Sequence, residues 1–411
     1  MKNSLKRRIL SALLTLALLS LLVACSVSNA EGTVDLMEDV SAPKIQVTDL
    51  DAEKFREYVF DFSTELFKKS TDDEKNSLVS PLSVMMALSM TANGASGNTL
   101  TQAEELLGEL ETLNVGLYYM NRKGVSSQLK TANSIWIKNS PDFDVKRDFL
   151  ETNATYYGAD AYLAPFDTNT VDDINGWVSK NTDGMIKKLL NDLNPDAMMC
   201  LISTVLFKAE WQEPFSHSAI ETFYNIKGEE EKAEMLKGNG QFFLEGENVV
   251  GYIKSYKNEK YSFIALLPNE NITVSEFIET MSADTLINII DNKISAPVQV
   301  TMPKFSYDYS ISLADILAEM GWSDAFNASA CFDRISDTHL YISDVIHKAH
   351  IELDKDGTEA AAASAVILSK GQSIVNPTTP IILTFDRPFV YIIYDNDAGL
   401  PLFMGTLNTT K

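Results

Sequence analysis

Two short patterns in the sequence carry side chains of the kind that catalytic sites use. Ser127-Gln128-Leu129-Lys130 has the Ser-x-x-Lys spacing of penicillin-binding enzymes, but the Lys-Thr-Gly triplet that accompanies it in those enzymes is absent. His347 and His350 could hold a metal from one face of a helix, but residues 340–353 are predicted to be extended, which points the two imidazoles to opposite faces. The chain also lacks a glycine-rich phosphate loop and a Gly-x-Ser-x-Gly elbow. The sequence therefore predicts no catalytic site.

The most unusual stretch of the chain is Gly357-Thr358-Glu359-Ala360-Ala361-Ala362-Ala363-Ser364. Taken alone, its run of alanines predicts a helix, because alanine has the highest helix propensity. If the stretch is a strand, Thr358, Ala360, Ala362 and Ser364 share one face, and all of them are small. Small side chains would let such a strand enter a packed sheet without overpacking it. The composition alone leaves both interpretations open.

Residues 1–24 have the pattern of a secretion signal. Four basic residues precede an apolar run over 9–24, which is too short for a membrane span. The run ends in Ala24-Cys25-Ser26, and small residues before a cysteine match the bacterial lipobox, in which Cys25 is acylated. The alternative is plain secretion with a cysteine nearby. Residues 25–50 are polar and acidic and predict a tether, so we expect a secreted or cell-surface lipoprotein that a lipid anchor holds at a membrane.

The charge of the chain excludes several classes of partner. The 34 basic and 57 acidic residues give −23, and residues 25–411, without the four basic residues of the signal, carry 30 − 57 = −27. Such a chain is not expected to bind nucleic acid. Cys200 and Cys331 lie in half-apolar surroundings and are more typical of buried thiols than of a disulfide, although a disulfide stays possible. The four histidines are too scattered for a metal site, and no cofactor is expected.

From about residue 51 the pattern becomes that of a folded domain. The nearly continuous apolar run Met199–Phe207 predicts a strand buried on both faces. Ser80-Pro81 predicts the start of a helix, with a hydroxyl cap before proline at the first helical position. Further strands are expected at 134–137, 242–256, 261–268, 297–306, 340–353, 381–394 and 401–407, and helices at 55–67, 174–190, 274–290 and 312–320. No repeat or linker divides 51–411, so one α+β domain is predicted.

Several of these segments resemble the serpins, a family of serine protease inhibitors. The segments that carry the resemblance are Asn76–Gly108, Leu201–Phe215, Leu340–Ala363, Phe385–Val390 and Leu402–Gly405. Together they extend over about 51–411. The resemblance implies a single domain with three β-sheets, eight or nine helices and an exposed reactive-centre loop.

The resemblance also implies an inhibitor, not an enzyme. A serine protease attacks the loop and forms a covalent acyl-enzyme, and the freed loop then inserts into the main sheet as a new strand. In this sequence the hinge of that loop matches Gly357–Ser364, whose residues are permissive for insertion. A non-inhibitory binding protein with the same fold is the alternative. The expected partner is an extracellular serine protease, and the protein itself is expected to be a monomer.

Family spacing places the reactive bond near Lys370 and Gly371, within 368–376, because the loop is longer than is typical. Cleavage after Lys370 would imply trypsin-like targets. Cleavage after Leu368, Ile374 or Val375 would imply elastase- or chymotrypsin-like ones. Residues 99–120 contain no Lys or Arg, so a heparin-type activator is not expected.

The resemblance further implies two regions that control insertion. The first is the shutter beneath the main sheet, which matches Ser80, Ser83, Ser203 and His347, and Ser203 stands where the family has asparagine. This departure is expected to loosen the hydrogen bonding there.

The second region is the breach at the top of the sheet, which matches Trp211. Where the family pairs a glutamate with a lysine, this chain has Lys355 and Lys304. We expect the two lysines to repel each other, with Asp354 or Asp356 available to compensate.

Overall fold

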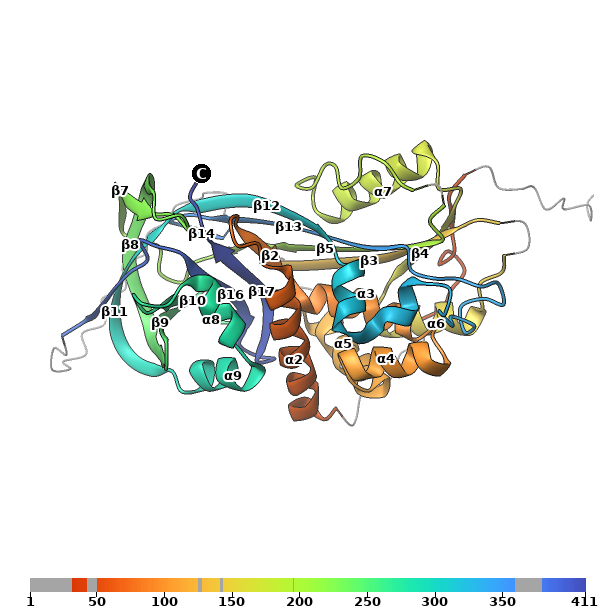
Figure 1. Ribbon diagram of the computed structural model, residues 1–411, viewed down its shortest axis with the longest axis horizontal. Helices are drawn as coiled ribbons and strands as arrows, with labels where there is room; N and C mark the ends of the chain where they lie inside the picture. The colour runs from red at the N-terminus through yellow and green to blue at the C-terminus, as the bar shows by residue number, and fades with distance from the viewer. Residues whose placement is uncertain (1–31, 43–49, 125–127, 141–142, 195, 359–378) are drawn as a thin grey trace, which may run out of the picture.

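The computed structural model describes residues 32–42, 50–124, 128–140, 143–194, 196–358 and 379–411 (Figure 1). The signal over 1–24, the predicted lipid-attachment residue Cys25, the hinge residues Glu359, Ala360, Ala361, Ala362, Ala363 and Ser364, and the reactive-bond candidates Lys370 and Gly371 lie outside the described residues.

The described residues form nine α-helices, in agreement with the eight or nine that were expected. They are α2 (Ala52–Ser70), α3 (Pro81–Ala92), α4 (Gly97–Leu107), α5 (Leu110–Gly124), α6 (Arg147–Tyr156), α7 (Thr168–Asn181), α8 (Val274–Thr280), α9 (Ala283–Asp291) and α10 (Ala314–Leu317). A π-turn and a 3-10 turn follow α10 and extend to Phe326.

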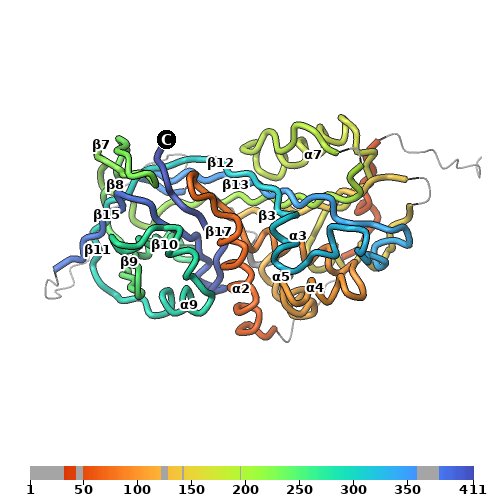
Figure 2. Tube along the Cα trace, in the orientation of Figure 1, coloured from red at the N-terminus to blue at the C-terminus, as the bar shows by residue number. Residues whose placement is uncertain are grey.

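The first sheet, called the main sheet below, has eight strands. In order across the sheet they are β1 (Val34–Asp35), β4 (Asp160–Ala164), β3 (Leu129–Lys138), β5 (Met199–Phe207), β13 (Asp344–Leu353), β14 (Gly357–Thr358) and β6 (Ala209–Glu210), with β12 (Phe305–Ser312) also paired to β13. Helix α7 covers one face of this sheet, and α3 and α5 lie on the other (Figures 1 and 2). Because both faces are covered, β5 is buried along its whole length, as its apolar sequence predicts.

The second sheet has nine strands. In order they are β15 (Ile381–Thr384), β11 (Ile294–Pro303), β8 (Glu230–Gly246), β9 (Val249–Ser255), β10 (Tyr261–Pro268), β16 (Phe389–Asp395), β17 (Leu400–Leu407) and β2 (Ser77–Val79), with β7 (His217–Tyr224) paired to β8. The 17-residue β8 pairs with β7 over residues 230–237, with β11 over 235–243 and with β9 over 242–246. Because β8 pairs with strands on both sides along its length, it joins two of the three expected sheets into a single sheet. The α+β class is confirmed.

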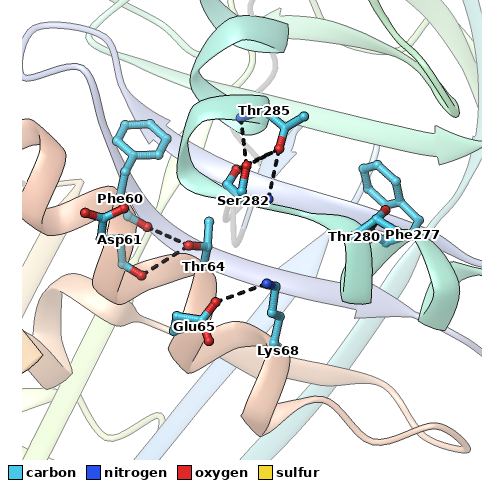
Figure 3. Close-up of polar contacts among 9 residues, drawn as sticks. All are labelled: Phe60, Asp61, Thr64, Glu65, Lys68, Phe277, Thr280, Ser282 and Thr285. Atoms are coloured by element: carbon cyan, nitrogen blue, oxygen red, sulfur yellow. Dashed lines mark hydrogen bonds and ion pairs between the residues drawn. The ribbon is translucent and has the colours of Figure 1, made fainter. Parts of the chain in front are cut away.

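Several predicted elements are divided where local capping or turns interrupt a continuous apolar pattern. The predicted helix 274–290 is two helices, because Ser282 and Thr285 form a capping box that starts α9, with the Thr285 N–H donating to Ser282 Oγ at 3.2 Å (Figure 3). Helix α7 starts at Thr168 and ends at Asn181 instead of 190, since Gly184 takes a φ of 78° just beyond it. Three predicted strands are also divided. The range 242–256 falls on β8 and β9, 297–306 on β11 and β12, and 381–394 on β15 and β16.

The segment 32–42 differs from the expectation of a tether that extends to residue 50. Val34 and Asp35 pair antiparallel with Leu163 and Tyr162 of β4, which makes β1 the edge strand of the main sheet. The Leu36 N–H also donates to Ala161 O at 2.9 Å. The tether prediction is therefore wrong for this segment, because its backbone N–H and C=O groups pair with those at the edge of β4, which would otherwise lack a neighbouring strand.

Candidate functional site

The main sheet is open at one end between two of its central strands. β5 and β13 pair in parallel from Cys200 with Asp344 to Thr204 with Lys348. Beyond that point, residues 205–207 still pair with β3 and residues 349–353 still pair with β12. Within the described chain, no ladder joins these two stretches to each other. We call this gap between 205–207 and 349–352 the open segment.

The short strand β14 lies at the end of the open segment. Thr358 pairs antiparallel with Leu353 of β13 on one side and with Ala209 of β6 on the other. A Cβ added to Gly357 would lie 2.2 Å from the carbonyl oxygen of Ala209, so only glycine permits this approach. The first two residues of the predicted hinge therefore already stand in the sheet, at the mouth of the open segment.

Trp211 holds the turn that leads into β14. Its backbone N–H donates to Asp356 O at 2.9 Å, and its indole Nε1–H donates to Asp354 O at 3.0 Å. The neighbouring Phe215 N–H donates to Lys355 O at 2.9 Å. Trp211 is completely buried, so these bonds are shielded from water. The structure thus places Trp211 where the sheet opens, the position that the resemblance implied.

Tyr256 connects Trp211 to the hinge. The two rings are stacked, with centroids 4.3 Å apart and an angle of 11° between their planes. The Tyr256 hydroxyl lies 2.6 Å from the Thr358 hydroxyl, and both side chains are buried. Tyr256 was not identified from the sequence, because Trp211 and Thr358, which it contacts, lie 45 and 102 positions away along the chain.

Lys304 and Lys355 are both exposed. The Lys355 amine lies 3.6 Å from the carboxylate of Asp356, so Asp356 supplies one of the two compensating charges that were considered. The carboxylate of Asp354, the other candidate, instead accepts from the N–H groups of Asp356 and Gly357. An exposed pair of this kind contributes little free energy, so the backbone bonds to Trp211 hold the turn.

The four predicted shutter residues are all buried and meet beneath β5 and β13. The Ser80 N–H donates to His347 Nε2 at 3.1 Å, and the hydroxyls of Ser83 and Ser203 lie 2.6 Å apart. Ser203 and His347 are direct register partners, one pair before the last pair that closes the sheet. These contacts attach the two strands to the start of α3.

Two details of the shutter differ from simple expectation. The Ser80 hydroxyl does not cap α3, because it donates to Leu402 O at 2.7 Å in β17. His347 Nδ1 is buried and has no hydrogen-bond partner among the described residues. Burial lowers the pKa of the His347 imidazole from 6.5 to about 4, so the ring is neutral and Nε2 accepts. The expected loosening by Ser203 stays a prediction.

Lys254 is a second residue of this region that was not identified from the sequence. Its amine lies 4.6 Å from the centre of the Phe215 ring and 5.6 Å from that of Trp211, and it donates to Asn239 O at 3.0 Å. Burial lowers the pKa of this amine from 10.5 to about 8, against a smaller opposing effect of Glu213. The only sequence signal is a basic residue that ends the apolar run VVGYI.

Other candidate chemistry finds no support in the described residues. None of their histidine, cysteine and carboxylate side chains cluster in threes as a metal would require. His350 contacts Asp308 on β12 at 2.8 Å. Cys200 and Cys331 are both free thiols, which excludes a disulfide between them in this structure. No described helix is both long and apolar enough to span a membrane.

Comparisons with known proteins agree with this geometry. The family model described as serpin (serine protease inhibitor) matches residues 57–410. An uncharacterized serpin-like protein of Thermococcus kodakarensis is 30% identical over 365 residues, which cover 85% of this chain and 84% of that protein. Neuroserpin of Homo sapiens is 27% identical over 387 residues, which cover 86% of this chain and 93% of neuroserpin.

Solved structures give the same result. The thermophilic serpin tengpin in its native state is 39% identical with a TM-score of 0.86, over 92% of this chain and 100% of tengpin. Tengpin in its latent state gives a TM-score of 0.76 at 37% identity, over 90% of this chain and 100% of tengpin. A thyroxine-binding globulin in complex with thyroxine gives 0.76 at 26% identity, over 87% of this chain and 100% of that one. From the family match, the fold and these relatives, the chain belongs to the serpin family.

Proposed function

We propose that this protein is a loop-inserting suicide inhibitor of extracellular serine proteases. The observation that carries the proposal is the open segment with β14 at its mouth. Among the described residues, 205–207 and 349–352 each have one strand edge without a ladder partner, and Thr358 pairs with Leu353 of β13 and Ala209 of β6. Unpaired edges of this kind accept an added strand.

The pairing register of Thr358 supports insertion of the residues that follow it. If the antiparallel register of Thr358 with Leu353 continued along β13, inserted residues 359–362 would lie opposite 352–349. If its register with Ala209 continued along β6 and β5, the same residues would lie opposite 208–205. An inserted Ala363 would then meet Thr204 and Lys348, where the sheet is closed. Glu359 and three alanines would therefore fill the open segment, and further insertion requires the shutter to part.

The energetics favour such an insertion. A loop of about a dozen residues gains ladder hydrogen bonds of about 1 kcal/mol each. Parting the shutter breaks the β5–β13 ladder over five register pairs, but the inserted strand forms ladder bonds to both β5 and β13 in its place. Displacing a catalytic group of the attached protease by about 1 Å costs about a hundredfold in rate, so the acyl-enzyme would be stranded.

We further propose that the target is a trypsin-like or an elastase-like protease. Lys370 favours the first class, whereas the nearby apolar residues of 368–376 favour the second. The net charge of −27 over residues 25–411 would speed encounters with cationic proteases at low salt. The lipobox at Cys25 supports a protein that acts outside the cell at a membrane surface.

The test is to mix the protein with trypsin-like and elastase-like proteases and to separate the products on denaturing gels. An SDS-stable one-to-one adduct is the expected result, and mass spectrometry of the released C-terminal peptide locates the reactive bond. Clean loop cleavage without an adduct, across a broad panel of serine proteases, would contradict inhibition. That outcome would favour a non-inhibitory binding protein with the same fold.

A further inference from the structure

The segment 32–42, which lies before the residues that the family model matches, is built into the domain by three separate elements. β1 pairs with β4. The Thr33 hydroxyl donates to Asp173 of α7 at 2.6 Å, and Arg147 of α6 donates to Asp39 O at 2.5 Å. Leu36, Met37 and Val40 are partly buried against the core. Apolar packing and paired backbone groups together show a docked segment, not a linker.

The strand register places this segment at one end of the main sheet. Val34 is opposite Leu163, Leu163 is opposite Ile137, and Ile137 is opposite Met199. Met199 is the first residue of β5. The hinge residue Thr358 pairs with Ala209, ten residues further along the same chain direction, which at about 3.3 Å per residue is about 33 Å away. In Figure 1, β4 and β14 lie at opposite ends of the sheet.

Docking also limits how far from β1 a group attached at Cys25 can lie. From Cys25 to Gly32 there are seven residue steps, which span at most about 25 Å even when fully extended. A free tether that extended to residue 50 would have 25 steps and could reach about 85 Å. A group attached at Cys25 is thus confined to the end of the domain that carries β1.

We propose that this docked segment orients the protein at a lipid bilayer, with the β1 end toward the lipid and the hinge end facing away. The inference rests on the proposed lipid attachment at Cys25. The orientation follows from where the chain leaves the domain and not from charge, because residues 25–411 carry −27 and are not attracted to anionic lipid. A protease arriving from outside then meets the loop on the exposed side.

The test measures two distances to the membrane. Fluorescent labels are placed at Ser140→Cys, which lies just beyond β3 at the β1 end, or at Ser216→Cys, beside the hinge end; both positions are exposed, and the background is Cys331→Ser. The full lipidated chain is reconstituted into phosphatidylcholine vesicles that contain a headgroup acceptor. We expect clearly more energy transfer from position 140 than from position 216. Equal transfer from the two positions would overturn the proposal.

A matched pair of insertions tests whether 32–42 is the cause. Fifteen Gly and Ser residues inserted between residues 30 and 31 should make transfer from the two labels nearly equal. The same insertion between residues 45 and 46 should leave the difference intact, because the docked segment stays upstream of it. If both insertions equalise the transfer, or neither does, the docked segment does not set the orientation.

Two separate measurements distinguish a failure of the lipid anchor from a failure of protease inhibition. Flotation with vesicles reports the anchor, with Cys25→Ala as the control that should stay in solution. If the wild-type chain does not float, the bilayer is not its partner and the inference falls. Adduct formation with proteases by the detergent-solubilised chain reports inhibition independently of both measurements.

Discussion

The hydroxyl of Thr358 lies 2.6 Å from the hydroxyl of Tyr256, in the interior of the domain. Tyr256 is stacked on Trp211, and Trp211 holds the turn that precedes the hinge through two carbonyl oxygens. The first hinge side chain is therefore fixed in the sheet before any protease arrives. Insertion would extend a strand that has already started, which removes the cost of starting one.

Thr358→Arg should strongly destabilise the native form. Thr358 is only 2% exposed and already pairs with Leu353 and Ala209, so the variant would bury a guanidinium beside Tyr256 at a cost of several kcal/mol before any protease arrives. Urea unfolding of the variant and of the wild type measures this loss.

The matched control for this variant is Thr358→Val, which keeps the size of the side chain and removes only the bond to Tyr256. It should lower stability by about 1–3 kcal/mol, because it leaves the buried Tyr256 hydroxyl without this bond. Equal unfolding midpoints of Thr358→Arg and wild type would show that the side chain of residue 358 is not buried in the sheet.

Ser83→Ala should destabilise the native form, whereas Ser89→Ala should not. Both serines are fully buried on α3, but within the described part of the chain only the Ser83 hydroxyl lies within hydrogen-bond distance of a partner, 2.6 Å from the hydroxyl of Ser203. Removing Ser83 Oγ leaves that hydroxyl unpaired, at a cost of about 1–3 kcal/mol. Urea unfolding of both variants measures the difference, and equal midpoints would show that the bond between Ser83 and Ser203 contributes nothing.

The buried His347 should make stability depend on pH between 6.5 and 4. Because burial lowers the pKa of His347 to about 4, the unfolded chain gains a proton below pH 6.5 that the folded chain does not accept until about pH 4. The free energy of unfolding should therefore fall as the pH falls, by up to about 3 kcal/mol over this window.

Denaturation midpoints measured from pH 4 to 7 test this dependence. In His347→Gln, the slope of the unfolding free energy against pH should fall by about 1.4 kcal/mol per pH unit, which corresponds to one proton. In His217→Gln on β7 the slope should stay as in the wild type. An unchanged slope in His347→Gln would show that another group is responsible.

Lys254→Met should raise stability at neutral pH. Burial lowers the pKa of the Lys254 amine to about 8, so keeping it charged at pH 7 costs free energy that methionine does not. The gain should be about 1–3 kcal/mol, since contacts of the amine with Phe215 and Trp211 offset part of the cost.

This gain should be fully present below pH 8 and disappear by about pH 10.5, where the unfolded lysine also loses its proton. Thermal unfolding of both proteins from pH 7 to 10.5 measures it. Lys187→Met, at an exposed position, should change stability by less than about 0.5 kcal/mol. A destabilised Lys254→Met at pH 7 would show that the amine contributes more by its contacts than burial costs.

The elements that the sequence predicted most accurately are those whose apolar runs are buried along their whole length. Met199–Phe207 and Tyr261–Pro268 have the predicted bounds because every residue in them is buried, so hydrophobicity alone marks their ends. The helix over 274–290 was wrong because its apolar period continues across Ser282, and only the capping box divides it.

The candidate site was predictable only in part. Ser80, Ser83, Ser203 and His347 meet as the resemblance implied, because each lies at a fixed position in a predictable element. The contacts of Tyr256 and Lys254 join residues brought together by sheet pairing, which no local pattern reveals. The docking of 32–42 depends in the same way on the open edge of β4.

Hydrogen exchange before and after loop cleavage tests the central claim most directly. Peptides that contain 205–207 and 349–352 report the backbone amides along the two edges of the open segment. If the loop inserts, exchange of these amides in the protease-cleaved protein should slow greatly relative to the intact protein, because a new strand pairs with both edges. Unchanged exchange in fully cleaved protein would contradict insertion and, with it, the inhibitory mechanism.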